Sequence, residues 1–176
     1  WMIHRPLSLT EDERGSTLTP PRSRCCSAAP PVLQFDKAGK LLKSWGGKGP
    51  GYDWPANEHG IYVDPKGDVW VGGNANTDHM LLKFTPEGKF LMQIGKPGQS
   101  KGSNAPDQLG RPAHMELDAA ANELYVADGY GNRRVIVFDA ATGAYKRHWG
   151  AYGNRPDDAK LPDYNPQSPQ FGNPVH

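Results

Sequence analysis

The stretch "GIYVDPKGDVWVGGNANTDHMLLKFTPEGKFLMQIG", residues 60–95, contains four short runs of apolar and β-branched residues separated by turns. The separators are rich in Gly, Pro, Asn and Asp, the residues that tight turns favour. Short runs of this composition between turn residues are typical of β-strands joined by hairpins. The stretch therefore predicts four consecutive antiparallel strands.

The same pattern recurs along the chain. Each copy has an apolar strand that ends at Phe, a polar turn that contains Gly, and a second strand that ends at Trp-Gly or Ile-Gly. The copies begin at Val32, Leu81 and Val135. A further pair of strands precedes two of them, "GIYVDPKGDVWVGG" from Gly60 and "HMELDAAANELYVADG" from His114. Four antiparallel strands repeated about every fifty residues are typical of β-propeller blades, whereas a sandwich would not need the same pattern three times.

The repeat predicts an all-β chain that forms a single partial β-propeller domain over residues 1–176. Its parts are a blade remnant at 1–6 and 32–46 with an insertion at 7–31, blades at 59–95 and 114–150, and the start of a further blade at 172–176. A closed propeller needs about four blades or more. We therefore expect this chain to be a fragment that cannot close the ring alone.

Composition excludes some classes of partner. The chain has 20 Lys and Arg against 19 Asp and Glu, which gives a net charge of +1 with no basic block, so a nucleic-acid partner is not favoured. No apolar run is long enough for a membrane span. The two cysteines, Cys25 and Cys26, are adjacent. Free thiols suit that spacing best, a strained vicinal disulfide or a metal contact stays open, and the compartment stays undetermined.

A family resemblance follows from the motifs. The pattern "HGIYVDPKGDVWV…LLKFTPEGKFLMQIG" resembles the NHL repeat, which is common in six-bladed propellers. The motifs "IHR", "EHGIYVD", "ADGYGNRRVIVFD…WG" and "QFGNPVH", in that order, resemble the peptidyl-α-hydroxyglycine α-amidating lyases. The resemblance implies a fragment of a six-bladed propeller, a secreted or periplasmic location, and an enzyme that cleaves a C-terminal hydroxyglycine to leave a peptide amide and glyoxylate.

The resemblance also implies site residues. In this family three His from different blades hold a zinc ion in the central channel, and two of them match His59 and His176, while the third would lie beyond the last residue. The family's catalytic Tyr corresponds to Tyr130 and one catalytic Arg to Arg5. A structural calcium would be bound through the backbone carbonyl of Ile61.

The chemistry of these residue types is consistent with those roles. Three neutral imidazoles that leave one open position are typical of a catalytic zinc. A phenol near a metal and a guanidinium can have its pKa lowered and act as a general base, which predicts that Tyr130 takes the proton of a substrate hydroxyl. Arg5 would stabilise the phenolate or a substrate carboxylate. The alternatives are that His59 is hydrogen-bonded to a neighbouring strand and that Tyr130 only caps a loop.

The turn that carries Tyr130 is crowded with polar side chains. We expect Asp128, Asn132 and either Arg133 or Arg134 mainly to brace the turn and to bridge blades. Gly131 stands where the family usually has a Cys that is paired in a disulfide. The turn is therefore expected to be held less firmly than in the family.

Three functions remain open from the sequence. The first is a zinc-dependent carbon–nitrogen lyase that acts on a peptide or small molecule with an α-hydroxyamide carbon. The second is a non-catalytic NHL-repeat propeller that binds a protein or a small ligand. The third, a lactonase-like hydrolase, requires carboxylate and Asn metal ligands around the channel, and no such set lies in register.

Overall fold

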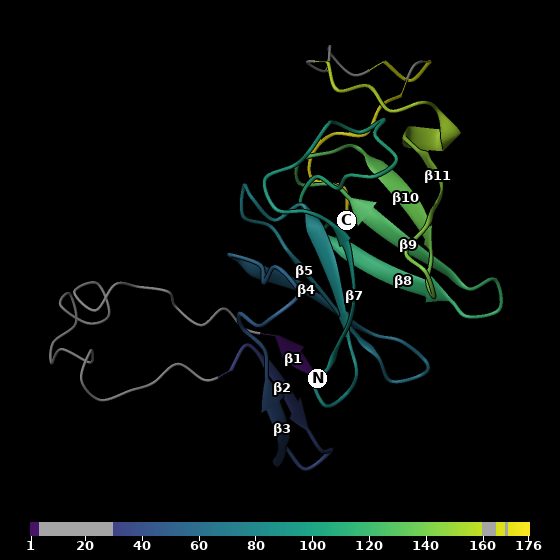
Figure 1. Cartoon of the computed structure of the whole chain (residues 1–176). Coiled ribbons are helices and arrows are strands. Elements are labelled where there is room, and N and C mark those ends of the chain that lie inside the picture. The colour runs from purple at the N-terminus through teal and green to yellow at the C-terminus, as the bar shows by residue number, and fades with distance from the viewer. Residues whose placement is uncertain (4–29, 160–164, 168) are drawn as a thin grey trace, which may run out of the picture. The chain divides into compact units, whose positions relative to one another are not determined.

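The computed structural model describes residues 1–3, 30–159, 165–167 and 169–176. These residues form eleven β-strands and one 3-10 turn, η1 (Ala151–Gly153), with no α-helix (Figure 1). The chain divides into two compact units, Trp1–Gly47 and Lys48–His176. Each unit is described by itself.

The first unit is a three-stranded antiparallel sheet. It consists of β1 (Met2–Ile3), β2 (Val32–Phe35) and β3 (Leu41–Trp45), in the order β1-β2-β3. Val32 of β2 is fully buried between its partners Ile3 and Trp45. The ring of Trp1 meets that of Trp45 edge-on, with the centroids 6.3 Å apart.

The second unit contains two four-stranded sheets, in each of which the strands follow one another in chain order, antiparallel throughout (Figure 1). The first sheet comprises β4 (Glu58–Val63), β5 (Val69–Gly73), β6 (Met80–Phe84) and β7 (Phe90–Gly95). The second comprises β8 (His114–Asp118), β9 (Glu123–Asp128), β10 (Arg134–Asp139) and β11 (Tyr145–Trp149). Both are four-stranded antiparallel blades, so the predicted fold class, an all-β partial β-propeller, is confirmed.

Aspartates close equivalent hairpins in the two blades. Asp64 Oδ1 accepts the backbone N–H groups of Lys66 and Asp68 after β4. Asp118 Oδ1 accepts those of Ala120 and Ala121 after β8. Aspartate favours turns because its carboxylate satisfies backbone donors that the strand ladder leaves free. The repeated Asp in the sequence is therefore a turn-forming residue.

The two blades of the second unit share one hydrophobic core. Its buried members come from both sheets and from the loop between them: Trp70, Leu81, Ile94, Leu109, Met115, Leu124, Val126, Ile136, Phe138 and Ala140. The strands β4 and β8 approach closely because Gly60 has no side chain; a Cβ there would lie 3.2 Å from the Ala113 carbonyl oxygen and 3.1 Å from Met115 Cε. Tyr62 Oη also accepts the Leu117 N–H at 3.3 Å. The starts of β4 and β8 therefore lie at the same end of the unit, where the candidate site is found.

Some predictions concern residues outside the described part of the chain. They include Arg5, most of the insertion at 7–31, and the cysteine pair Cys25 and Cys26. In the part that is described, no helix has both the length and the apolar character needed to cross a membrane.

Candidate active site

His59 is placed by an irregularity in β4. In the pairing of β4 with β5, Glu58 lies opposite Gly73 and Gly60 lies opposite Gly72, so His59 is the extra residue of a β-bulge. Bulges disrupt the ladder locally and re-aim a side chain. The His59 imidazole is consequently exposed at the beginning of β4 rather than packed between strands.

Tyr130 lies in the turn between β9 and β10. Its backbone N–H donates to the Arg111 carbonyl oxygen at 3.2 Å, and Arg111 Nη2 donates to the Tyr130 carbonyl oxygen at 2.5 Å. These reciprocal bonds fix the main chain of Tyr130. Its Oη lies 2.8 Å from Nε2 of His59, a hydrogen bond between residues of different blades whose donor depends on the imidazole tautomer.

His176 completes a cluster of three rings. Its ring centroid lies 4.9 Å from that of Tyr130 and 6.0 Å from that of His59, and the His59 and Tyr130 centroids are 5.0 Å apart. All three pairs meet edge-on. The structure thus brings together His59, His176 and Tyr130, three of the residues that the sequence singled out, although their chemical roles stay predictions.

Gly129 allows His176 to reach this cluster. Val175 N–H donates to the Gly129 carbonyl oxygen at 3.1 Å, and a Cβ on Gly129 would collide with the Val175 backbone. The C-terminus lies beside the end of β9 in Figure 1. A side chain at position 129 would therefore displace the segment that carries His176.

A buried ion pair supports the Tyr130 turn. Asp128 and Arg134 are fully buried, and Arg134 Nε donates to Asp128 Oδ2 at 2.9 Å. Asp128 also accepts from Asn132 Nδ2 at 2.8 Å and from Gly110 N–H at 2.7 Å. Burial raises the pKa of the Asp128 carboxyl, and these three donors oppose the rise. The remaining Arg134 N–H groups bind three carbonyl oxygens of the loop before β8, those of Ser103, Ala105 and Gln108. Asp128, Asn132 and Arg134 thus brace the turn, as the sequence suggested.

The structure accounts for glycine at position 131. Gly131 N–H donates to the Gly110 carbonyl oxygen at 2.7 Å, and a Cβ on Gly131 would lie only 2.8 Å from that oxygen. A larger residue would force the turn away from Gly110. The turn is held at this position by the backbone hydrogen bond to Gly110.

The remaining predicted site residues lie apart from the ring cluster or outside the described chain. Ile61 is half-buried on β4, opposite Val71, and its role at a calcium ion stays a prediction. Arg5 lies outside the described residues.

Sequence reasoning did not single out two residues that organise the site. Arg111 has a left-handed backbone, with φ at 60°, and also donates from Nη1 to Asn76 Oδ1 at 3.1 Å. Nothing in "LGRPAH" indicates that conformation. Asn173 belongs to the quoted motif "QFGNPVH", and its contacts with the Tyr130 turn join residues about forty positions apart.

His59 and His176 fit a shared zinc ion in part. Two imidazoles bound to one tetrahedral zinc at about 2.0–2.1 Å place their ring centroids roughly 5–5.5 Å apart, and these two centroids are slightly farther apart, at 6.0 Å. Imidazole nitrogen is a preferred zinc donor. Among the residues that the structure describes, no three or more His, Cys, Asp or Glu are grouped to hold a metal. The pair is therefore a partial donor set.

Comparison with known proteins gives partial matches, of which two are described. Over 109 residues, 60% of this chain and 24% of the relative, the chain is 33% identical to peptidyl-alpha-hydroxyglycine alpha-amidating lyase 2 of Drosophila melanogaster. Over 114 residues, 61% of this chain and 31% of the relative, it is 29% identical to NHL repeat-containing protein 3 of Mus musculus. No family model matches the chain.

These matches confirm the resemblance that the motifs indicated, to amidating lyases and to NHL-repeat proteins, at about 30% identity over part of the chain. The chain spans less than a third of the length of either relative. The similarity therefore supports an NHL-type propeller and leaves the activity to be argued from the site.

Proposed function

We propose that this chain contributes to the active site of a zinc-dependent lyase that cleaves a carbon–nitrogen bond at a hydroxylated carbon, giving an amide and glyoxylate. The observation that carries the proposal is the hydrogen bond between Tyr130 Oη and His59 Nε2, with His176 against both rings. The partial match to an amidating lyase supports it.

His59 and His176 would hold the metal. When bound, zinc would supply a Lewis acid that polarises the oxygen of the substrate. Nε2 of His59 can engage one partner at a time, either Tyr130 Oη or a metal ion, so metal binding through that atom would release Tyr130 Oη from its present partner. The phenol would then be available to the substrate.

Tyr130 would be the residue that moves a proton. In its phenolate form Tyr130 would act as general base, and its Oη would take the proton of the substrate hydroxyl, whose oxygen then forms the carbonyl bond of glyoxylate. The carbon–nitrogen bond breaks, its electron pair goes to the nitrogen, and Tyr130 returns the proton there. The bonds between Tyr130 and Arg111 keep the main chain fixed while the phenol reacts.

The other proposed roles follow the resemblance. Arg5 would stabilise negative charge on the phenolate or on a substrate carboxylate. The carbonyl oxygen of Ile61 would be a calcium ligand, a role that suits a hard oxygen donor. A substrate of this enzyme is a peptide or small molecule with an α-hydroxyamide carbon.

Glyoxylate release from a hydroxyglycine peptide tests the proposal in the full-length protein. We expect Tyr130→Phe to retain zinc and to lose about 100-fold or more in turnover, because general-base catalysis contributes about that much. His59→Ala should lower zinc content. The exposed His114 of β8 provides the control His114→Ala, which should change neither quantity. Turnover by Tyr130→Phe equal to that of the unsubstituted protein would exclude Tyr130 as the base.

A binding propeller is the second candidate. The match to NHL repeat-containing protein 3, which is about as long as the match to the lyase, favours it. If the unsubstituted protein released no glyoxylate, the chain would be assigned to a propeller that binds a protein or a small ligand.

A further inference from the structure

We propose that Arg133 and Asn173 form a relay that positions His176 in the ring cluster. The guanidinium of Arg133 holds the carboxamide of Asn173, and that carboxamide fastens the segment before His176 to the Tyr130 turn. The relay concerns how His176 is held beside Tyr130, with or without a metal ion. Its importance for zinc binding rests on the proposed function.

His176 needs specific side-chain contacts to fix its position because it does not belong to a β-sheet. The described residues 169–176 include no β-strand, and most of them are exposed or half-buried. A segment of this kind does not gain a fixed position from ladder hydrogen bonds or from core packing. The orientation of His176 must therefore come from a few specific contacts.

Asn173 supplies most of these contacts. Its Nδ2 donates to the Gly129 carbonyl oxygen at 2.8 Å and to the Asn132 carbonyl oxygen at 2.8 Å. Its Oδ1 accepts from Arg133 Nε at 3.0 Å. Both donors of the carboxamide and its acceptor are thus engaged by residues on either side of Tyr130. The Val175 N–H adds a bond to the same Gly129 oxygen.

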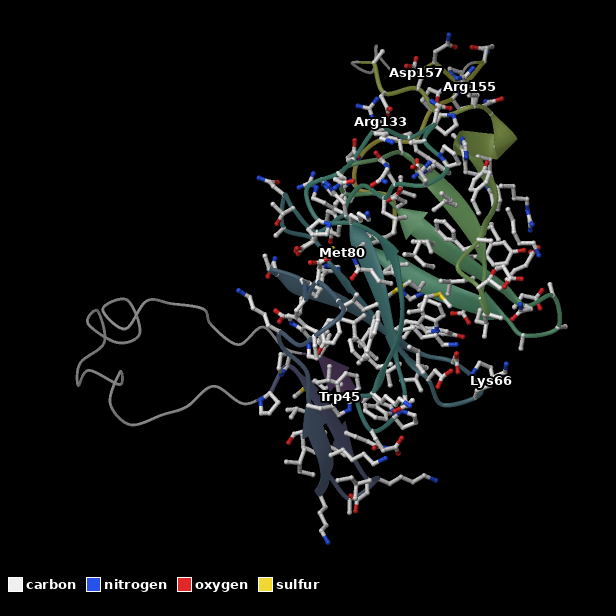
Figure 2. All side chains as sticks on the ribbon, viewed as in Figure 1. Trp45, Lys66, Met80, Arg133, Arg155 and Asp157 are labelled. Carbon is white, nitrogen blue, oxygen red and sulfur yellow. The ribbon has the colours of Figure 1, made fainter. Side chains whose placement is uncertain are left out.

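Arg133 fixes the other end of the relay. Its Nη1 donates to the Asp157 and Ala159 carbonyl oxygens at 3.0 and 2.6 Å, and its backbone N–H donates to Ser103 Oγ at 2.8 Å. Figure 2 shows Arg133 at the same end of the second unit as Asp157. In the described part of the chain no carboxylate pairs with this guanidinium. Arg133 therefore acts through its planar array of N–H donors, which a lysine ammonium does not reproduce.

The arrangement makes Arg133 and Asn173 positioning residues, since the described hydrogen bonds of their side chains go to the main chain and to each other and none goes to the rings of His59, Tyr130 or His176. Asn173 binds the carbonyl oxygens of Gly129 and Asn132, the residues that flank Tyr130 and Gly131 in the turn. A change at position 173 should leave the buried Asp128–Arg134 pair intact while releasing His176. The relay is therefore expected to fix the position of His176 without changing the stability of the whole fold.

Two measurements on the full-length protein test the relay. The first is the nuclear Overhauser effect between the ring protons of His176 and Tyr130 in the metal-free, selectively labelled protein. The second is the affinity for zinc alone, measured by competition with a chromophoric chelator. The variants are Asn173→Asp, which replaces the Nδ2 donor by an oxygen that faces the Gly129 and Asn132 carbonyl oxygens, and Arg133→Lys, which keeps the positive charge and loses the planar array of N–H donors.

Matched controls lie in the same region. Asn165→Ala removes an exposed Asn whose Oδ1 accepts the Gln167 N–H of its own turn. Arg155→Lys alters a guanidinium that binds Asn104. Both controls should retain the ring contact and the zinc affinity.

We expect both relay variants to lose the His176–Tyr130 ring contact and to bind zinc about 10–100-fold more weakly, the usual effect of removing a residue that orients a metal ligand. If either folded relay variant keeps both the contact and the affinity, the relay is wrong. If the unsubstituted protein shows the contact and binds no zinc, the zinc part of the proposed function fails, and the relay is then decided by whether the variants lose the ring contact. If the Asn173→Asp variant does not fold, the Arg133→Lys variant alone decides whether the relay positions His176.

Discussion

Single residues in the Tyr130 turn determine whether the site can form. Gly129 and Gly131 are needed because other backbones occupy the space of their side chains, and Asp128 with Arg134 is a fully buried ion pair. A buried charge is tolerated when it is paired and hydrogen-bonded, and it becomes costly when one partner is removed. These residues therefore support the site without touching its rings.

Asp128→Asn should be strongly destabilising. It leaves the Arg134 guanidinium buried without a counter-charge, a change that costs about 3–5 kcal/mol. Chemical denaturation measures the loss in free energy of unfolding. The exposed pair of Lys101 and Asp107 provides the comparison, and Asp107→Asn should cost much less because exposed pairs are weak. Equal losses for the two variants would contradict a supporting role for the buried pair.

Gly129→Ala should displace the last residues of the chain. The new methyl group would occupy the position of the Val175 backbone, so the Val175 N–H would lose its bond to the Gly129 oxygen. Hydrogen exchange of the Val175 amide should accelerate, while exchange in β9 and β10 should stay slow. Tyr152→Ala, at a residue that is 91% exposed, should leave Val175 protected. Unchanged Val175 protection in Gly129→Ala would show that the segment is held elsewhere.

The strands and hairpins could be predicted because their signals are local. The apolar runs, the Gly turns and the repeated Asp at hairpins reappear as β4 to β11 and their connections. The bulge that exposes His59 could not be predicted, because it depends on the register between β4 and β5. The left-handed backbone of Arg111 and the bonds of Asn173 depend on long-range contacts that a repeat pattern does not encode. The motifs identified the three ring residues of the site, while the residues that hold them emerged only from the structure.

Gly60→Val should separate the first strands of the two blades. Its side chain would meet the Ala113 carbonyl oxygen and Met115 Cε, which lie 3.2 and 3.1 Å from the nearest Cβ position. Overpacking at a close contact of this kind costs about 1–3 kcal/mol. The hydrogen bonds of Tyr62 to Glu116 and Leu117 should weaken as well. Urea unfolding with tyrosine fluorescence detection measures both effects, and an unchanged midpoint would refute the close approach of β4 and β8.

At the scale of the whole molecule, stability should depend on half-buried histidines. Burial lowers the pKa of His79, with a further decrease from Arg111, and Asp128 and Asp78 act in the opposite direction. Burial also lowers the pKa of His148. The folded state therefore favours the neutral imidazoles. Their contribution to stability is present above the unfolded pKa of about 6.5 and is lost as the pH falls through the lower folded pKa.

The thermal midpoint should accordingly decrease between about pH 7 and pH 5. The double variant His79→Gln, His148→Gln should flatten this decrease, whereas His114→Gln, at an exposed position, should not. Differential scanning calorimetry across this range measures the effect. If the thermal midpoint of the double variant changed with pH as steeply as that of the unsubstituted protein, the pH dependence would come from other groups.

The most direct test of the account is the X-ray absorption spectrum at the zinc edge of the full-length, zinc-loaded protein. The central claim is that His59 and His176 are ligands of one zinc ion beside Tyr130. The claim predicts imidazole scattering with nitrogen at about 2.0–2.1 Å, reduced by one imidazole in each of His59→Ala and His176→Ala and unchanged in Tyr130→Phe. A spectrum without imidazole scattering, or one that neither histidine substitution alters, would contradict it.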